Sequence, residues 1–209
     1  MKDAENRYMN QNVNILQNFM EHLKNSCTED FIRSMLFCFA APTIRGLKAS
    51  CLINFKRRKN EDIRSSWIKH AYEWLSPLGL EWILLSQTHE HNNALVLIYK
   101  RELLAGALCC DKACCILKEY GYPLPDVDAC LECLQKKFPS CPENFPHEIG
   151  IFLDYPPDDV RGFIEKREAK VMPCPCYWKV YGNAEEARKR FMKYKQAEYD
   201  AARLIMSGR

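Results

Sequence analysis

Two apolar segments of strand length, joined by a short polar turn, limit the fold more than any other feature of this sequence. "LEWILLSQ" and "NALVLIYK" are rich in aliphatic and aromatic residues and lie on either side of "THEHNN". Such a pattern predicts a hairpin or two neighbouring strands. Further strands are expected in "KASCLINF" (48–55) and "CYWKVYG" (176–182). The sheet should therefore be small.

Helical patterns surround these strands. Apolar residues recur at intervals of three and four in most other segments, and "RELLAGALCCDKACCILKEYGYP" (101–123) is interpreted as one strong helix. Asn183 and Glu186 form an analogue of the capping box for a final helix, which is long, basic and amphipathic. We therefore predict an α/β (or α+β) fold, in which a mixed sheet of three to four strands is covered by about seven helices. Residues 1–10 are expected to be a flexible tail, and 11–209 a single domain.

Composition excludes several classes of protein. The chain has 209 residues and a formal net charge of +3, from 30 basic and 27 acidic residues. This near balance does not favour nucleic acid or an anionic membrane as a partner. The first dozen residues are polar, and the most apolar early stretch (35–41) is too short to span a bilayer, so we expect a soluble, cytoplasmic protein. The glycine motifs of nucleotide-binding loops and of serine hydrolases are absent.

The twelve cysteines favour reduced thiols over a disulfide framework. They make up about 6% of the chain, below the roughly 8–10% typical of short disulfide scaffolds. On one continuous helix Cys110 and Cys114 would face the core as small apolar residues. The loop "PCPC" holds Cys174 and Cys176 in an extended conformation, and with His147 they are candidate ligands for zinc or iron.

The segment "FPHEIGIFLDYPPDDVRGFI" (145–164) has two interpretations. His147-Glu148 opens like a zinc-protease motif, but Ile151 stands where the second histidine would be. A histidine beside a glutamate in a hinge can act as a general base or a ligand. The alternative is structural: two short, well-capped helices, the second beginning at Pro157, whose aspartate pair supports the helix start.

A second candidate site lies in "PTIRGLKAS" (42–50). Thr43, Arg45 and Lys48 in a helix-to-strand connection could cradle a phosphate or a carboxylate. A solvated basic loop is the alternative.

Four segments together carry a family resemblance: "APTIRGLKASCLINF", "ALVLIYKRELL", the segment 145–164, and "CYWKVYGNAEEARKRFMKYK". They resemble a family of Firmicute proteins, many from gut anaerobes, described as domain of unknown function 3793, over roughly residues 30 to 196. The resemblance implies an anaerobic, cytoplasmic setting and brings no established activity. Its members read Gly-Tyr-Pro where this chain has Asp154-Tyr155-Pro156. The residues that match its motifs are Pro42, Lys48, His147, Glu148, Gly150, Tyr155, Pro156, Gly162, Trp178, Lys179, Tyr181 and Gly182.

Three hypotheses of function follow. In the first, the protein binds or transforms a small anionic molecule. Its candidate catalytic residues are His147, Glu148, Lys48 and Tyr155, and its candidate ligand-binding residues are Thr43, Arg45, Lys48, Trp178, Lys179 and Tyr181. In the second, it is a metal-binding or thiol-redox accessory protein that uses Cys174, Cys176, His147 and Cys38. In the third, it is a protein-interaction module without catalysis. Whether it is an enzyme stays open at this level.

Overall fold

A three-stranded antiparallel sheet lies at the centre of the molecule. The computed structural model describes residues 14–56, 61–85, 94–138, 145–170, 172 and 177–208. The strand order is β1 (Ser50–Phe55), β3 (Ala94–Tyr99), β2 (Glu81–Leu84), so that β3 pairs with both neighbours. Two neighbouring strands were predicted for the apolar pair 80–87 and 93–100, and β2 and β3 confirm them. The strands are antiparallel and the helices lie outside the sheet, so the fold is α+β.

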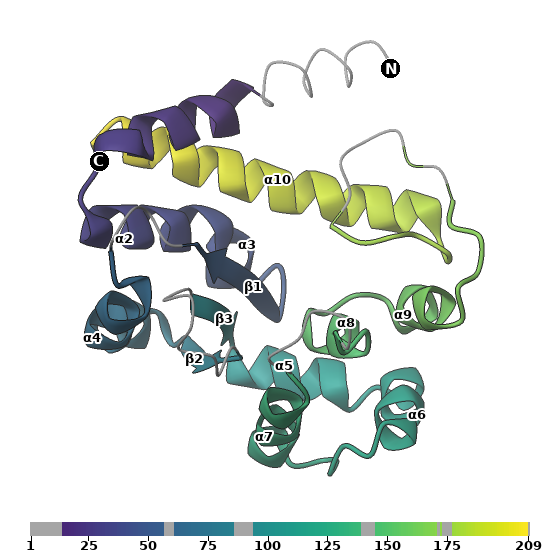
Figure 1. Cartoon of the computed structure of the whole chain (residues 1–209). Helices are drawn as coiled ribbons and strands as arrows, with labels where there is room; N and C mark the ends of the chain where they lie inside the picture. The colour runs from purple at the N-terminus through teal and green to yellow at the C-terminus, as the bar shows by residue number, and fades with distance from the viewer. Residues whose placement is uncertain are drawn as a thin grey trace.

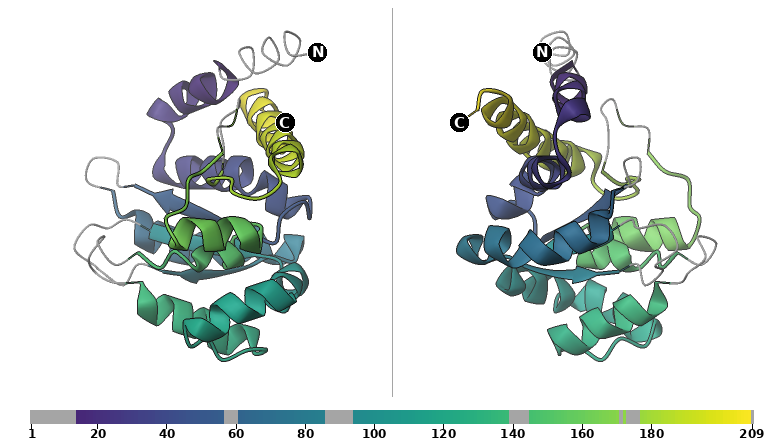
Figure 2. Two further views of the ribbon diagram at one scale, coloured as in Figure 1. Left: turned by 90° about the vertical axis from the view of Figure 1, so that its right-hand side faces the viewer. Right: turned by 60° about the vertical axis from the view of Figure 1, so that its left-hand side comes forward.

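Helices cover both faces of the sheet (Figure 1). On one face lie a helical stretch at 14–22, η1 (Leu23–Asn25), α2 (Thr28–Phe39), α3 (Ala41–Ile44), α4 (Ile63–Leu75), η2 (Ser76–Leu78) and α10 (Ala184–Met206). On the other lie α5 (Arg101–Leu108), α6 (Asp111–Glu119), α7 (Val127–Lys137), α8 (Ile149–Phe152) and α9 (Pro157–Ile164). Both views in Figure 2 keep the α5–α7 group across the sheet from α10.

Alternation along β3 divides the core into two. Val96 and Ile98 pack with α2 and α4 on one face, whereas Leu97 and Tyr99 pack with α5 to α9 on the other. This is the expected result of side chains pointing to opposite faces along a strand. A third, smaller cluster joins Trp178 and Val180 to the first half of α10.

Two predicted elements differ from the structure. Residues 101–123 form two helices, because the backbone is extended at Cys110, the N-cap residue just before α6. The sequence there is Gly-Ala-Leu-Cys-Cys-Asp, in which Gly, Cys and Asp are all weak helix formers. As a result Cys110 is exposed and Cys114 half-buried, so Cys110 is not the core residue that one continuous helix would make it. The helices consequently outnumber the seven or so expected.

The second difference is at the predicted fourth strand. Within 177–182 the chain bends and forms no strand, so that the sheet in the described residues has three strands. Among these residues no helix has both the length and the apolar character that crossing a bilayer requires.

Candidate functional site

The segment 145–164 folds into two short helices, α8 and α9, which pack closely on each other. A Cβ atom built on Gly150 would lie 2.7 Å from Val160 Cγ2, so only glycine permits this approach. Pro157 occupies the first turn of α9, followed by Asp158 and Asp159. The segment therefore forms two short helices, as the structural interpretation predicts, but neither helix has a side-chain cap.

Asp159 connects α9 to the loop at 177–182. Its side chain is buried and accepts three hydrogen bonds: from Trp178 Nε1 at 2.7 Å, from the Tyr181 amide at 2.7 Å and from the Gly182 amide at 2.6 Å. The neighbouring Asp158 forms an ion pair with Lys112 instead. Both aspartates thus have structural partners, and Asp159 fixes the position of the Trp178 ring.

Between α8, α9 and residues 177–179 lies a pocket of about 660 Å³, which we call the aromatic pocket. Tyr155 and Trp178 stack in its wall with ring centroids 4.7 Å apart. Most of the other walls are aliphatic or aromatic. The lining residues are Phe145, His147, Ile149, Gly150, Leu153, Tyr155, Asp159, Val160, Phe163, Tyr177, Trp178 and Lys179.

Two exposed polar residues that line the aromatic pocket contact the same aromatic ring. The His147 ring meets the Phe163 ring edge to face at 5.0 Å, and Lys179 Nζ lies 5.5 Å from the centre of the same Phe163 ring. In the described part of the chain, no donor or acceptor is bonded to the imidazole of His147. Phe163 therefore contacts both the imidazole of His147 and the amine of Lys179.

Glu148, although adjacent to His147 in sequence, has its partners elsewhere. Its carboxylate is buried, accepts a hydrogen bond from Tyr122 Oη at 3.1 Å and lies 3.4 Å from Lys137 Nζ. It does not line the aromatic pocket. The structure thus places Glu148 in an ion pair that joins α8 to α7, rather than beside a catalytic histidine.

Lys48 lies in a separate cavity of about 440 Å³, which we call the lysine chamber. Its side chain is only 5% exposed, and Nζ lies 5.1, 5.5 and 5.9 Å from the ring centres of Tyr155, Tyr177 and Tyr194. Tyr155 and Tyr177 also line the aromatic pocket, so the two cavities share a wall. The chamber is lined by Met35, Phe39, Pro42, Lys48, Cys51, Leu52, Ile53, Asn54, Leu153, Tyr155, Tyr177, Lys195 and Glu198.

Burial dominates the electrostatics of this chamber. It lowers the pKa of the Lys48 amine, against the attraction of nearby Asp154 and Glu198. Burial also raises the pKa of Tyr155 to about 12. Glu198 is itself buried; it accepts a hydrogen bond from Tyr177 Oη at 2.7 Å and pairs with Lys195 at 2.8 Å.

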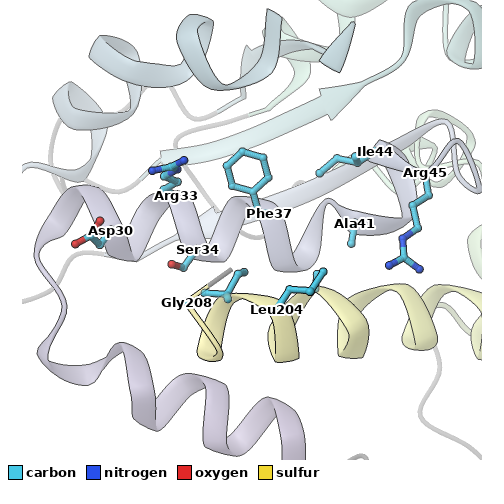
Figure 3. A pocket seen from close by; sticks show the side chains of 11 residues that line it. Asp30, Arg33, Ser34, Phe37, Ala41, Ile44, Arg45, Leu204 and Gly208 are labelled. Carbon is cyan, nitrogen blue, oxygen red and sulfur yellow. The ribbon is translucent and has the colours of Figure 1, made fainter. Parts of the chain in front are cut away.

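The predicted anion cradle at 42–50 is not assembled. Arg45 is exposed, pairs with Asp200 at 3.0 Å, and lines a groove between α2, α3 and the end of α10. Figure 3 shows Arg45 extending from the end of α3 toward α10 in that groove. Thr43 is fully buried, and Lys48 belongs to the lysine chamber. Thr43, Arg45 and Lys48 thus have three different environments, although they are close in sequence.

The metal hypothesis rests mainly on residues outside the described ones. Cys174 and Cys176 lie there, so their proposed role with His147 stays a prediction. Burial raises the pKa of the Cys38 thiol to about 12, which keeps it protonated at neutral pH and ill suited to redox or metal chemistry. Across the ranges that the structure describes, no group of three or more His, Cys, Asp or Glu residues is placed to hold a metal ion.

Sequence reasoning missed Tyr177, Tyr194 and Glu198. The sequence did contain a pattern that indicates Tyr194 and Glu198. They are spaced by four residues on the final helix, so that an acidic side chain falls on its apolar face. Tyr181, predicted to bind ligand, packs its ring against Gly162, where a Cβ would lie 2.5 Å from Tyr181 Cγ.

Comparison with family models gives one match, to a family described as "Protein of unknown function (DUF3793)", over residues 36–209. The chain belongs to this family. The DUF3793 region covers the three strands of the described residues, the whole lining of the aromatic pocket, and the lining of the lysine chamber except Met35. Searches of curated proteins and of solved structures gave no match. The expectation of this family from the four sequence segments is confirmed.

Proposed function

We propose that this DUF3793 protein binds a small organic anion with an aromatic or other flat apolar body in the aromatic pocket. One observation carries the proposal: His147, Tyr155, Trp178 and Lys179, all selected from the sequence, line a single cavity of about 660 Å³. Ligand sites are typically concave and mostly apolar, with a few polar groups that fix the orientation of the ligand. The aromatic pocket has this composition.

The wall and the polar groups suit different parts of such a ligand. The Trp178 indole nitrogen is already bonded to Asp159, so the stacked pair of Trp178 and Tyr155 is held in place as an apolar wall for the body of the ligand. His147 and Lys179 flank Phe163 and can both attract an anionic group. Imidazole side chains exchange protons near neutral pH, so His147 is the candidate acid or base if the bound molecule is transformed.

A matched set of ligands tests the proposal. We would titrate the protein with aromatic carboxylates such as 2-naphthoate and with the corresponding neutral alcohols, using calorimetry. Saturable binding of a carboxylate is expected, with the alcohol bound about tenfold more weakly, since the charge contributes on the order of 1 kcal/mol. Equal affinity for acid and alcohol, or no saturable binding across the set, would argue against an anion site.

Variants locate the site and separate the hypotheses. His147→Ala and Lys179→Ala should each weaken carboxylate binding several-fold, whereas Lys136→Ala, at an exposed position on α7, should not. Chelator should leave binding unchanged. If chelator abolishes binding, the metal hypothesis with Cys174 and Cys176 gains support instead.

A further inference from the structure

The lysine chamber holds a buried amine for which the described residues provide no hydrogen-bond acceptor. Lys48 is 5% exposed, and within the described part of the chain its Nζ faces three tyrosine rings, whose centres lie 5.1 to 5.9 Å away. Lysine is almost never this buried unless it is paired. A buried, unpaired amine that lines a cavity points to a site for a ligand.

The charged groups around Lys48 have other partners. Asp154, which follows α8, accepts a hydrogen bond from the Ala49 amide at 3.2 Å. On α10, Glu198 is occupied by Tyr177 and Lys195. On β1, burial raises the pKa of the Cys51 thiol to about 11, so it carries no charge at neutral pH. The two carboxylates therefore supply negative potential to Lys48 without bonding its nitrogen.

We propose that the Lys48 amine is a nucleophile that forms a Schiff base with an aldehyde or ketone admitted to the lysine chamber. In this step the amine nitrogen adds to the carbonyl carbon, giving a carbinolamine. The carbinolamine then loses its hydroxyl group as water, and the product is an imine or, when protonated, an iminium cation. No oxidant, reductant or further reactant is needed. Desolvated lysines are the ones that proteins use in this way.

The surroundings suit the iminium better than the ammonium. An ammonium group has three N–H donors to satisfy, whereas an iminium nitrogen has one. Both are cations, so the tyrosine faces and the potential of Asp154 and Glu198 favour each of them. A site that offers ring faces but few acceptors thus stabilises the product relative to the free lysine.

The chamber has room and an apolar character for a small carbonyl compound. Its volume is about 440 Å³, and Met35, Leu52 and Leu153 contribute aliphatic walls. The proposal is independent of the proposed function, because the chamber has its own lining apart from Leu153, Tyr155 and Tyr177.

Reductive trapping tests the proposal on the full chain. We would incubate the protein at neutral pH with limiting propanal and cyanoborohydride, which reduces the imine to a stable secondary amine, and map the modified lysines by peptide mass spectrometry. Lys48 should be modified at least tenfold faster than exposed Lys136 and Lys179, because exposed amines are largely protonated at this pH.

Three results would decide the matter. Preferential labelling of Lys48 that is lost on denaturation supports the proposal. Labelling of Lys136 and Lys179 with Lys48 untouched, or labelling of Lys48 only after denaturation, overturns it. Lys48→Met, which replaces a buried charge with an apolar chain of similar length, should lose the fast labelling but retain 2-naphthoate binding. This outcome separates the chamber from the aromatic pocket.

Discussion

At the scale of single residues, Asp154 is the most informative position in the chain. Its φ is 58°, in the left-handed region that glycine adopts without cost, and the family resemblance leads one to expect glycine there. The aspartate instead uses its carboxylate, which accepts a hydrogen bond from the Ala49 amide at 3.2 Å. The strained residue thereby ties the α8–α9 hinge to the start of β1, next to Lys48.

Replacing this aspartate with glycine should therefore change stability by two opposing effects. Asp154→Gly relieves about 1 kcal/mol of backbone strain but loses a hydrogen bond to a charged acceptor, worth roughly 1.5–3 kcal/mol. We expect a net loss of about 1 kcal/mol in the free energy of unfolding, measured by urea denaturation. Asp154→Asn, which tolerates the same φ and keeps an acceptor oxygen, should lose less. A glycine variant more stable than the wild type would mean that strain outweighs the hydrogen bond.

At the scale of elements, the closest approach in the candidate site is that of α9 to the loop at 177–182. A Cβ on Gly162 would lie 2.5 Å from Tyr181 Cγ, and this loop also presents Trp178 to the aromatic pocket. The packing of α9 against the loop thus depends on the absence of a side chain at Gly162 and on the three hydrogen bonds that Asp159 accepts.

A methyl group at this contact should be costly. Gly162→Ala forces the loop to move, and we expect a loss of about 1–3 kcal/mol, as in other overpacked sites, together with a changed Trp178 environment in fluorescence. Gly106→Ala is the matched control, because it lies in a helix with no atom within 4 Å of its Cβ position. Helix propensity predicts a gain of up to about 1 kcal/mol there. Equal effects of both substitutions would show that the Gly162–Tyr181 contact is not tight.

The sequence predicted elements better than it predicted the site. Apolar patterns located β2 and β3, Pro157 and the aspartates after it located the start of α9, and the capping signal at Asn183 located the start of α10. The break at Cys110 was missed although weak helix formers mark it, and the irregular loop at 177–182 was missed because it depends on packing against α9, which is distant along the chain. The same dependence explains why Glu148 turns away from His147: a two-residue motif does not encode which helix each side chain will meet.

At the scale of the whole molecule, one sheet joins two cores. The central strand β3 supplies Val96 to the first core and Leu97 to the second, so neither core can lose its packing without disturbing the strand that serves both. The buried tyrosines, by contrast, lie outside the first core. Burial raises the pKa of five of them, at positions in the second core and around Lys48: Tyr99, Tyr122, Tyr155, Tyr177 and Tyr194.

These shifts predict cooperative unfolding in alkali. A tyrosine whose pKa is raised by folding keeps its proton in the folded state while the unfolded chain releases it, so stability falls as the pH rises above about 10. Lys48 acts in the opposite sense. Burial lowers its pKa, so the free energy of unfolding rises as the pH approaches 10.5, the ordinary value for lysine. Above that pH Lys48 adds no further stability to offset the loss from the tyrosines.

Tyrosinate absorbance and circular dichroism, followed together against pH, check this prediction. Part of the signal from the ten tyrosines should appear only as the helices unfold, and all of it should appear near pH 10 in guanidinium chloride. Burial raises the pKa of Tyr194 to about 12, so Tyr194→Phe should move the unfolding midpoint to higher pH relative to wild type, whereas Tyr72→Phe, at a side chain 78% exposed, should not. If every tyrosine ionised before the circular dichroism changed, the rings around Lys48 would be open to solvent, and the desolvation that makes its amine a nucleophile would be lost with them.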